Sequence, residues 1–284
     1  MTVPLPFKDS SLASRVIMSI LYGPVILLVF WRGGLPLFIL MTLVVMVGEW
    51  ELFSMNRTIL RLPHRIIGYI AGLTMMIDTF FSSDPHLLGI LIAALACYFL
   101  VEIFTGTDRK FQAVSYSFFI TVYPALLAAY LLKIDKLPFI IFGIETRFVL
   151  VIMLLYVWLF DTVSYFSGRI WGKEPFFPQV SPRKTREGFI GGLVSVIAMA
   201  VVVSLLTDWE SFPHFFVIGI LTALSGQMGD LAESLIKRDM GVKDSSNLIP
   251  GHGGILDRFD SLIFAGPIIY GYLLLCCRYW GGCL

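Results

Sequence analysis

Long apolar stretches recur along the whole chain, and short polar segments separate them. A membrane-spanning helix needs about 20 mostly apolar residues, and nine stretches meet or approach that length. They are Ala13–Phe30, Leu35–Phe53, Ile66–Phe81, Leu87–Phe104, Gln112–Leu132, Arg147–Ser167, Phe189–Leu206, His214–Leu235 and Phe259–Cys277. The third is the shortest and contains Asp78. The pattern predicts an all-α, polytopic membrane bundle of about nine transmembrane helices.

Composition supports this prediction, because 57% of the 284 residues are hydrophobic and only 14% are charged. Soluble domains carry about 25% charged residues. The net charge of +1 gives no sign of a nucleic-acid partner, and none is expected. The four cysteines lack metal-ligand spacing, so we expect them to be packing residues rather than a disulfide framework. The polar N-terminus favours a retained first helix over a signal peptide.

The positions of lysine and arginine predict the orientation, because cytoplasmic segments of membrane proteins are enriched in both. With the N-terminus in the cytoplasm, that side holds 16 of the 21 lysines and arginines. The opposite side holds the other five, Arg32, Lys133, Lys136, Arg147 and Arg278. We therefore expect a multi-pass protein of the cytoplasmic (inner) membrane whose N-terminus and polar loops are cytoplasmic.

Two long polar loops, 168–188 and 237–258, both fall on the predicted cytoplasmic side. A water-soluble substrate bound there would come from the cytosol. Charge clusters concentrate in the second half of the chain, so we predict a scaffold of helices 1–5 in residues 1–146. Residues 147–284, with helices 6–9 and both loops, would form the catalytic half.

The most polar stretch runs from Ser234 to Asp260, and carboxylates flank it on two helices. Asp230 lies about two turns inside the eighth span, and Asp257 and Asp260 lie at the start of the ninth. Carboxylates at that depth need partners, and Mg²⁺ is bound by one or two carboxylates together with substrate phosphates. Asp230 and Asp257 are the predicted ligands. Alternatives remain: an ion pair for Asp230, and a favourable helix-dipole charge for Asp260.

The turn Ile249-Pro-Gly-His-Gly-Gly254 lies between these carboxylates. Glycines let backbone N–H groups approach a ligand closely, and N–H groups ahead of a helix form an anion cradle. His252 could serve as a phosphate donor, a proton carrier or a turn residue. A transition-metal site is not expected, because no second histidine or cysteine is near.

The other loop contains the segment Ser181–Gly188, SPRKTREG, in which hydroxyls alternate with cations. This is the chemistry of a phosphate clamp, although a positive-inside signal explains the cations and close helix packing explains the following glycines equally well. Asp161 lies at the same depth in the sixth span as Asp230 in the eighth, which suggests a shared polar pocket. Four further acidic residues are read as structural or interfacial, namely Glu49, Glu51, Asp78 and Glu102.

The stretch Ser234–Asp260 closely resembles the signature of the phosphatidate cytidylyltransferase (CDP-diacylglycerol synthase) family. Ser234, Lys237-Arg238, Lys243-Asp244, His252-Gly253-Gly254, Asp257-Arg258 and Asp260 fill each position of that pattern. SPRKTREG is similar to the family's Ser-Pro-x-Lys-Thr-x-Glu-Gly element, with Arg183 as a mild departure, and Asp161 matches an aspartate of the preceding helix. Before residue 150 only the general hydropathy is similar.

The resemblance implies that CTP and phosphatidate react to give CDP-diacylglycerol and pyrophosphate at the bilayer. It also implies dependence on Mg²⁺, leaves room for a monovalent cation such as K⁺, and leaves a homodimer open. Catalytic roles are expected for Lys237, Arg238, Asp257 and Arg258. Substrate binding is expected for Ser181, Arg183, Lys184, Thr185, Ser234, Lys243, Asp244, His252, Gly253 and Gly254. Metal coordination is expected for Asp230 and Asp257, with Asp161 and Asp260 as further candidates.

Two other functions fit parts of the pattern. A CTP-dependent kinase of polyprenol or phytol type would use the same nucleotide but transfer its γ-phosphate to an alcohol. An ion-coupled transporter would also place carboxylates within spans, but the chain shows no internal repeat of the kind that transporters often have.

Overall fold

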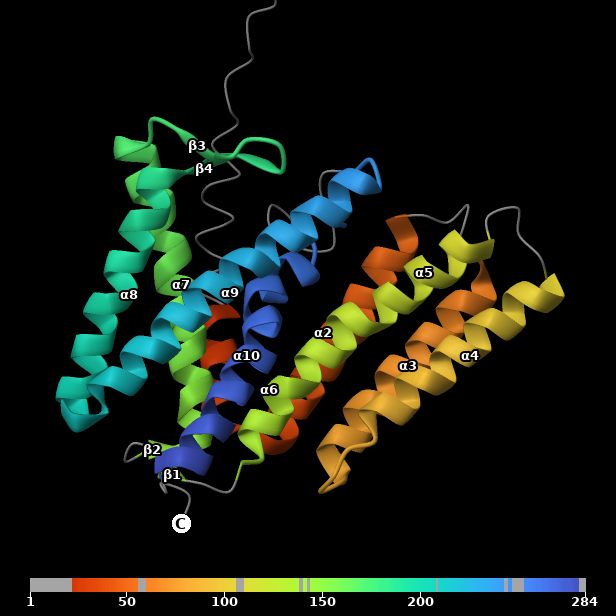
Figure 1. Ribbon diagram of the computed structural model, residues 1–284, viewed down its shortest axis with the longest axis horizontal. Coiled ribbons are helices and arrows are strands. Elements are labelled where there is room, and N and C mark those ends of the chain that lie inside the picture. Colours follow the sequence, from red (N-terminus) through yellow and green to blue (C-terminus); the bar gives the residue numbers. More distant parts are fainter. Residues whose placement is uncertain are drawn as a thin grey trace, which may run out of the picture.

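The computed structural model describes residues 22–55, 60–105, 110–137, 140–141, 144–207, 209–242, 245–246 and 253–280. This part of the chain is largely helical (Figure 1). After a helix at Tyr22–Arg32 come α2 (Gly34–Met55), α3 (Leu62–Phe81), α4 (Leu87–Thr105), α5 (Lys110–Thr121), the π-helix η1 (Val122–Leu126), α6 (Leu127–Asp135), α7 (Thr146–Trp171), α8 (Arg186–Leu206), the 3₁₀ turn η2 (Trp209–Ser211), α9 (Phe212–Asp239) and α10 (Leu256–Trp280).

Seven helical segments of the described chain are long and apolar enough to cross a membrane, which confirms the all-α polytopic class. They are Gly34–Met55, Leu87–Thr105, Lys110–Asp135, Phe148–Trp171, Arg186–Leu206, Trp209–Asp239 and Leu256–Arg278, and each overlaps a predicted span. The predicted third span corresponds to α3, which carries Arg65 and Asp78 and is not among the seven. The predicted first span lies partly outside the described residues.

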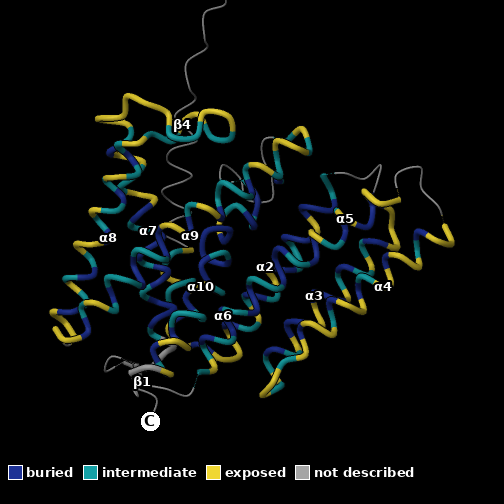
Figure 2. Tube along the Cα trace, viewed as in Figure 1, coloured by how far each residue is buried: buried dark blue, intermediate teal, exposed yellow. Residues whose placement is uncertain are grey.

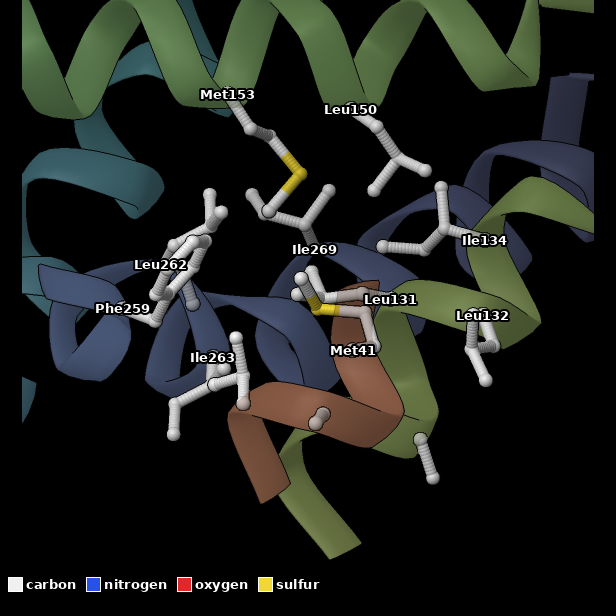
Figure 3. Close-up of a cluster of buried hydrophobic side chains, with 14 of the residues drawn as sticks. Met41, Leu131, Leu132, Ile134, Leu150, Met153, Phe259, Leu262, Ile263 and Ile269 are labelled. Carbon is white, nitrogen blue, oxygen red and sulfur yellow. The ribbon is translucent and has the colours of Figure 1, made fainter. Parts of the chain in front are cut away.

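Helix α10 lies at the centre, packed against α9 on one side and α6 on the other (Figure 1). Helices α7 and α8 complete the group around α9, while α3, α4 and α5 pack together beyond α2. One apolar core runs through both halves, with Met41 of α2, Leu131 of α6, Met153 of α7 and Ile263 of α10 in the same cluster (Figure 3). The division at residue 146 therefore crosses a continuous core, and it stays a prediction about function.

Large apolar side chains also cover the outside of the bundle, whereas the buried positions lie toward its middle (Figure 2). Phe104 of α4 and Leu206 of α8 are more than four-fifths exposed. Contiguous exposed apolar surface on this scale is rare in soluble monomers, and in a membrane protein lipid tails cover it.

The α5–α6 span contains Pro124, and its backbone is a π-helix at that point. Proline lacks an N–H and clashes with the carbonyl four residues earlier, and π-bulges are a common way to accommodate an interruption in a helix. The neighbouring Tyr123 is buried, and its hydroxyl donates to the carbonyl of Gly229 in α9 at 3.4 Å. The irregular turn thus places a polar group of the first half against α9.

Two short antiparallel hairpins accompany the helices: β1 (Ile140–Ile141) with β2 (Ile144–Glu145), and β3 (Pro175–Phe177) with β4 (Ser181–Thr185). The second hairpin lies in the segment 168–188, for which the sequence predicts a polar loop. Pro175 is opposite Thr185, and Phe177 is opposite Ser181. The hairpin follows α7, which continues to Trp171. The segment 181–185 is therefore extended and fixed at the end of the α7–α8 pair.

The expectation that all cysteines are packing residues is wrong for Cys277, which is disulfide-bonded. Cys97 and Cys276 are free. Cys277 lies near the end of α10, at the opposite end of the bundle from the β3–β4 hairpin (Figure 1).

Candidate active site

Helices α9 and α10 pack closely because glycines of α9 face α10. A Cβ atom on Gly229 would lie 2.6 Å from the carbonyl oxygen of Asp260 and 2.7 Å from Cβ of Phe264. Small residues are the usual means of close helix approach in membrane proteins. The close approach brings the polar end of α9 next to the first turns of α10.

The first ion pair of the site joins the two helices, because Lys237 of α9 donates to Oδ1 of Asp257 in α10. The lysine side chain is 12% exposed and the aspartate side chain 13%. Lys237 Nζ also lies 3.4 Å from Oε1 of the fully buried Glu233, one turn earlier on α9. One lysine therefore neutralises charge on two carboxylates.

The second ion pair joins α9 to the β3–β4 hairpin, because Lys184 donates to Oδ2 of Asp230. These side chains are 30% and 38% exposed, so they lie nearer to solvent than the first pair. The alternative that Asp230 forms an ion pair is thus observed, with a partner from the predicted phosphate clamp rather than from a helix. The first polar loop of the sequence therefore contacts the eighth predicted span at this pair.

Two further aspartates complete an acidic cluster of five carboxyl groups, those of Asp161, Asp230, Glu233, Asp257 and Asp260. Asp260 is buried and interacts electrostatically with Asp230, Glu233 and Asp161. Asp161, an exposed residue of α7, interacts electrostatically with Lys184, Asp230 and Arg258. Asp161 and Asp230 therefore interact across two helices, and the shared pocket expected from their similar depth stays a prediction.

Asp230 and Asp257 belong to the same cluster but are paired with different lysines, and the acidic residues between them are Asp260 and Glu233. Among the described residues, no group of three or more histidine, cysteine, aspartate or glutamate side chains is arranged to hold a metal ion. The donor set nevertheless suits a hard cation. Five carboxyl groups face three cations, Lys184, Lys237 and Arg258, and the buried Glu233 shares Lys237 with Asp257.

The described end of the glycine turn, Gly253 and Gly254, contacts Asp257. Gly253 has φ +82°, a conformation that favours glycine. The N–H of Gly254 donates to Oδ2 of Asp257 at 2.8 Å, and the hydroxyl of Ser245 donates to the same oxygen at 2.8 Å. The N–H of Gly254 is thus bonded to a carboxylate, so a role of this turn as an anion cradle stays a prediction.

The other predicted site residues differ in burial and in contacts. Thr185 caps α8, because its hydroxyl accepts from the N–H of Gly188 at 3.2 Å. Ser181 and Ser234 are half-buried, whereas Arg183, Arg238 and Arg258 are exposed. Lys243, Asp244 and His252 lie outside the described residues. The binding and catalytic roles of all of these residues stay predictions.

Gly188 and Gly191, at and after the end of the segment Ser181–Gly188, lie where α8 packs against α7. Close helix packing was one of the explanations that the sequence left open for them. A Cβ atom on Gly188 would lie 2.7 Å from the carbonyl oxygen of Ser164, and one on Gly191 would lie 2.7 Å from Cβ of Ser167. These contacts hold α8 tightly against α7 and so fix the hairpin that carries Lys184.

Three residues that contact the cluster or the loop before α10 were not predicted as site residues from the sequence. Glu233 shares the helical face of Asp230 and Lys237, and this spacing was the available signal. Tyr123 interacts electrostatically with Asp230, Glu233, Asp257 and Asp260, and the proline beside it was a weak signal. Glu51 was read as structural or interfacial, and it contacts the loop before α10 directly.

Comparison with known proteins agrees with this geometry. Residues 13–276 match the model of the cytidylyltransferase family. The chain is 32% identical to the phosphatidate cytidylyltransferase of Bacillus subtilis over 271 residues, which covers 92% of this chain and 97% of the relative. It is 32% identical to that of Aquifex aeolicus over 268 residues (93% and 92%) and 33% identical to that of Staphylococcus saprophyticus over 263 residues (90% and 95%).

The chain belongs to the cytidylyltransferase family and is a membrane-embedded nucleotidyltransferase. Asp257 and Asp260 of the cluster, with Lys237 and the glycine turn, lie in the stretch Ser234–Asp260 that resembles the family signature.

Replacing Gly254 with alanine should damage the site, because the new Cβ would overlap Oγ of Ser245 and lie 2.6 Å from Oε1 of Glu51. Overpacking of this kind costs about 1–3 kcal/mol. We expect Gly254→Ala to lower the thermal unfolding midpoint in detergent and to reduce turnover of CTP. Gly271→Ala is the matched control on α10, because nothing lies within 4 Å of its Cβ position. Equal behaviour of the two variants would contradict the packing argument.

Proposed function

We propose that this protein converts CTP and phosphatidate to CDP-diacylglycerol and pyrophosphate. Relatives that cover nearly the whole chain carry the name phosphatidate cytidylyltransferase, and these relatives give no support to a lipid-alcohol kinase or a transporter. The observation that carries the proposal is the acidic cluster, in which Lys184 forms an ion pair with Asp230 and Lys237 forms one with Asp257. Carboxylates and cations in one place suit a triphosphate with a divalent cation.

In the proposed reaction, an oxygen of the lipid phosphate attacks the α-phosphorus of CTP. The new P–O bond forms as the bond to the β-phosphate breaks, and pyrophosphate leaves with that electron pair. A phosphate monoester has a second pKa near about 6, so the attacking group is largely a dianion at neutral pH and needs no strong base. The main barrier is the repulsion between two anions.

The protein's own cations reduce this repulsion. Lys184 and Lys237 reach the cluster from a hairpin and a helix, and Arg258 adds a third positive charge near Asp161. If Asp230 and Asp257 held a divalent cation, Lys184 and Lys237 would be available to donate to phosphate oxygens. Such charge-assisted hydrogen bonds stabilise the charge that develops on the leaving pyrophosphate.

Asp230 and Asp257 are the residues that would hold Mg²⁺, with Asp161 and Asp260 as further candidates and with room for K⁺ nearby. When bound, Mg²⁺ would neutralise phosphate charge and orient the phosphate oxygens. Glu233 adds a buried carboxyl that shares Lys237 with Asp257. The carboxyl groups described here therefore outnumber the cations, which supports the binding of a cation.

The catalytic test uses purified protein with phosphatidate, Mg²⁺ and CTP that carries its radiolabel at either the α- or the γ-phosphate. We expect α-label in the lipid and γ-label in pyrophosphate, and we expect EDTA to stop both. A lipid kinase would place the γ-label in the lipid. That outcome, or full turnover in EDTA, would exclude the proposed reaction.

The metal assignment is tested by Asp257→Asn, which keeps the size of the side chain but removes its charge. Turnover should fall on the order of 10²–10³-fold, the range for loss of one important electrostatic group in an active site. Helix content and monodispersity should stay normal, and Asp84→Asn at the other end of the bundle serves as the control. Turnover of Asp257→Asn within twofold of the parent protein would rule this assignment out.

We also propose that the acidic cluster lies on the cytoplasmic side of the inner membrane, with the N-terminus on the same side. The lysine and arginine asymmetry supports this orientation, as does the disulfide of Cys277 at the other end. In a Cys97→Ser background, an impermeant maleimide should label Lys173→Cys in inverted vesicles and Asp84→Cys in intact cells. Both positions are exposed. The reverse pattern would contradict the orientation.

A further inference from the structure

Glu51 is a fully buried glutamate in the last turns of α2, far from the acidic cluster in sequence. Its Oε1 accepts from the hydroxyl of Ser246 at 2.6 Å and from the N–H of Ile255 at 2.9 Å. Its Oε2 accepts from the N–H of Leu256 at 3.0 Å. All these donors lie in the loop before α10 or in its first turn.

The contacts of Glu51 and Asp257 form a matching pair. Each carboxylate binds one of the adjacent serines, Ser245 for Asp257 and Ser246 for Glu51. Each also binds backbone N–H groups at the start of α10, Gly254 for Asp257 and the next two residues for Glu51. The two carboxylates therefore tie both ends of the segment 245–256 together, and this segment contains the glycine turn.

These bonds determine where Asp257 lies. The first N–H groups of a helix have no partner within the helix. Glu51 accepts from that of Leu256, the first residue of α10, and from that of Ile255 just before it. Leu256 is buried, so its N–H cannot turn to water instead. Asp257 follows Leu256 directly, and its orientation toward Lys237 depends on the orientation of this turn.

We propose that Glu51 is a positioning residue for the reaction, supplied by the half of the chain that was expected to be only a scaffold. It fixes the first turn of α10 and closes the preceding loop, so that Asp257 is held in a conformation ready to bind a cation. The inference rests on the proposed role of Asp257. Groups that orient metal ligands typically change metal affinity by about 10- to 100-fold when they are mutated.

The chain offers a closely matched control in Glu49, two residues earlier on α2. It is also a fully buried glutamate, but neither of its carboxylate oxygens has a hydrogen-bond partner among the described residues. A Cβ atom on Gly72 of α3 would collide with it, so it faces another helix and not the loop before α10. Glu49→Gln therefore tests for the general effect of removing a buried charge from α2.

The experiment measures binding of Mn²⁺ in the presence of CTP by electron paramagnetic resonance, which does not depend on turnover. Glu51→Ala should raise the Kd for Mn²⁺ about 10- to 100-fold. Glu51→Gln keeps one oxygen acceptor, so its Kd should lie between those of Glu51→Ala and the parent protein. Glu49→Gln should stay within about twofold of the parent. If Glu51→Ala does not fold, the comparison of Glu51→Gln with Glu49→Gln decides.

Asp257→Asn separates this inference from the function on which it rests. If Asp257→Asn abolishes Mn²⁺ binding while Glu51→Gln and Glu51→Ala bind like the parent, Glu51 has no positioning role and the metal assignment stands. If Asp257→Asn binds Mn²⁺ normally, the metal assignment itself fails. Equal losses in Glu49→Gln and Glu51→Gln would also overturn the inference, because they would show a non-specific effect of α2.

Discussion

The main physical constraint on this protein is that ionised groups beside hydrocarbon must be neutralised by neighbours. The described helices place five carboxyl groups at one end of the bundle, and the fold pairs them by bringing Lys184 from a hairpin and Lys237 from the same helix face. The pairing is incomplete, because the carboxyl groups outnumber the cations. This excess of carboxyl groups is the observation on which the proposed binding of a cation rests.

Helix packing makes this arrangement possible. Gly229 lets α9 approach α10, and Gly188 and Gly191 let α8 approach α7. Each close contact lies near a charged residue of the cluster, Asp230 in one case and Lys184 in the other. The small residues therefore serve chemistry as well as packing, because a wider separation of either helix pair would separate the charges that neutralise one another.

Much of the fold followed from the sequence, because the length and apolarity of a membrane-spanning helix are properties of local sequence. The location of the site followed as well, since charges are so rare elsewhere in the chain. The partners of each charge did not follow. Nothing in the sequence pattern distinguished Lys184 from Lys237 as the partner of Asp230. The β3–β4 hairpin that positions Lys184 is too short to show a periodic pattern of apolar and polar residues. Glu51 was missed for a related reason, since its partners are 195 to 205 residues away.

A structure of the protein with Mn²⁺ and a non-hydrolysable CTP analogue would test the central claim most directly, because Mn²⁺ is located by its anomalous scattering. The account predicts an anomalous peak at coordination distance from the carboxylates of Asp230 and Asp257. It also predicts that Lys184 and Lys237 have moved from these carboxylates to phosphate oxygens. A peak away from both aspartates, or both lysine pairs intact with the nucleotide bound, would contradict it.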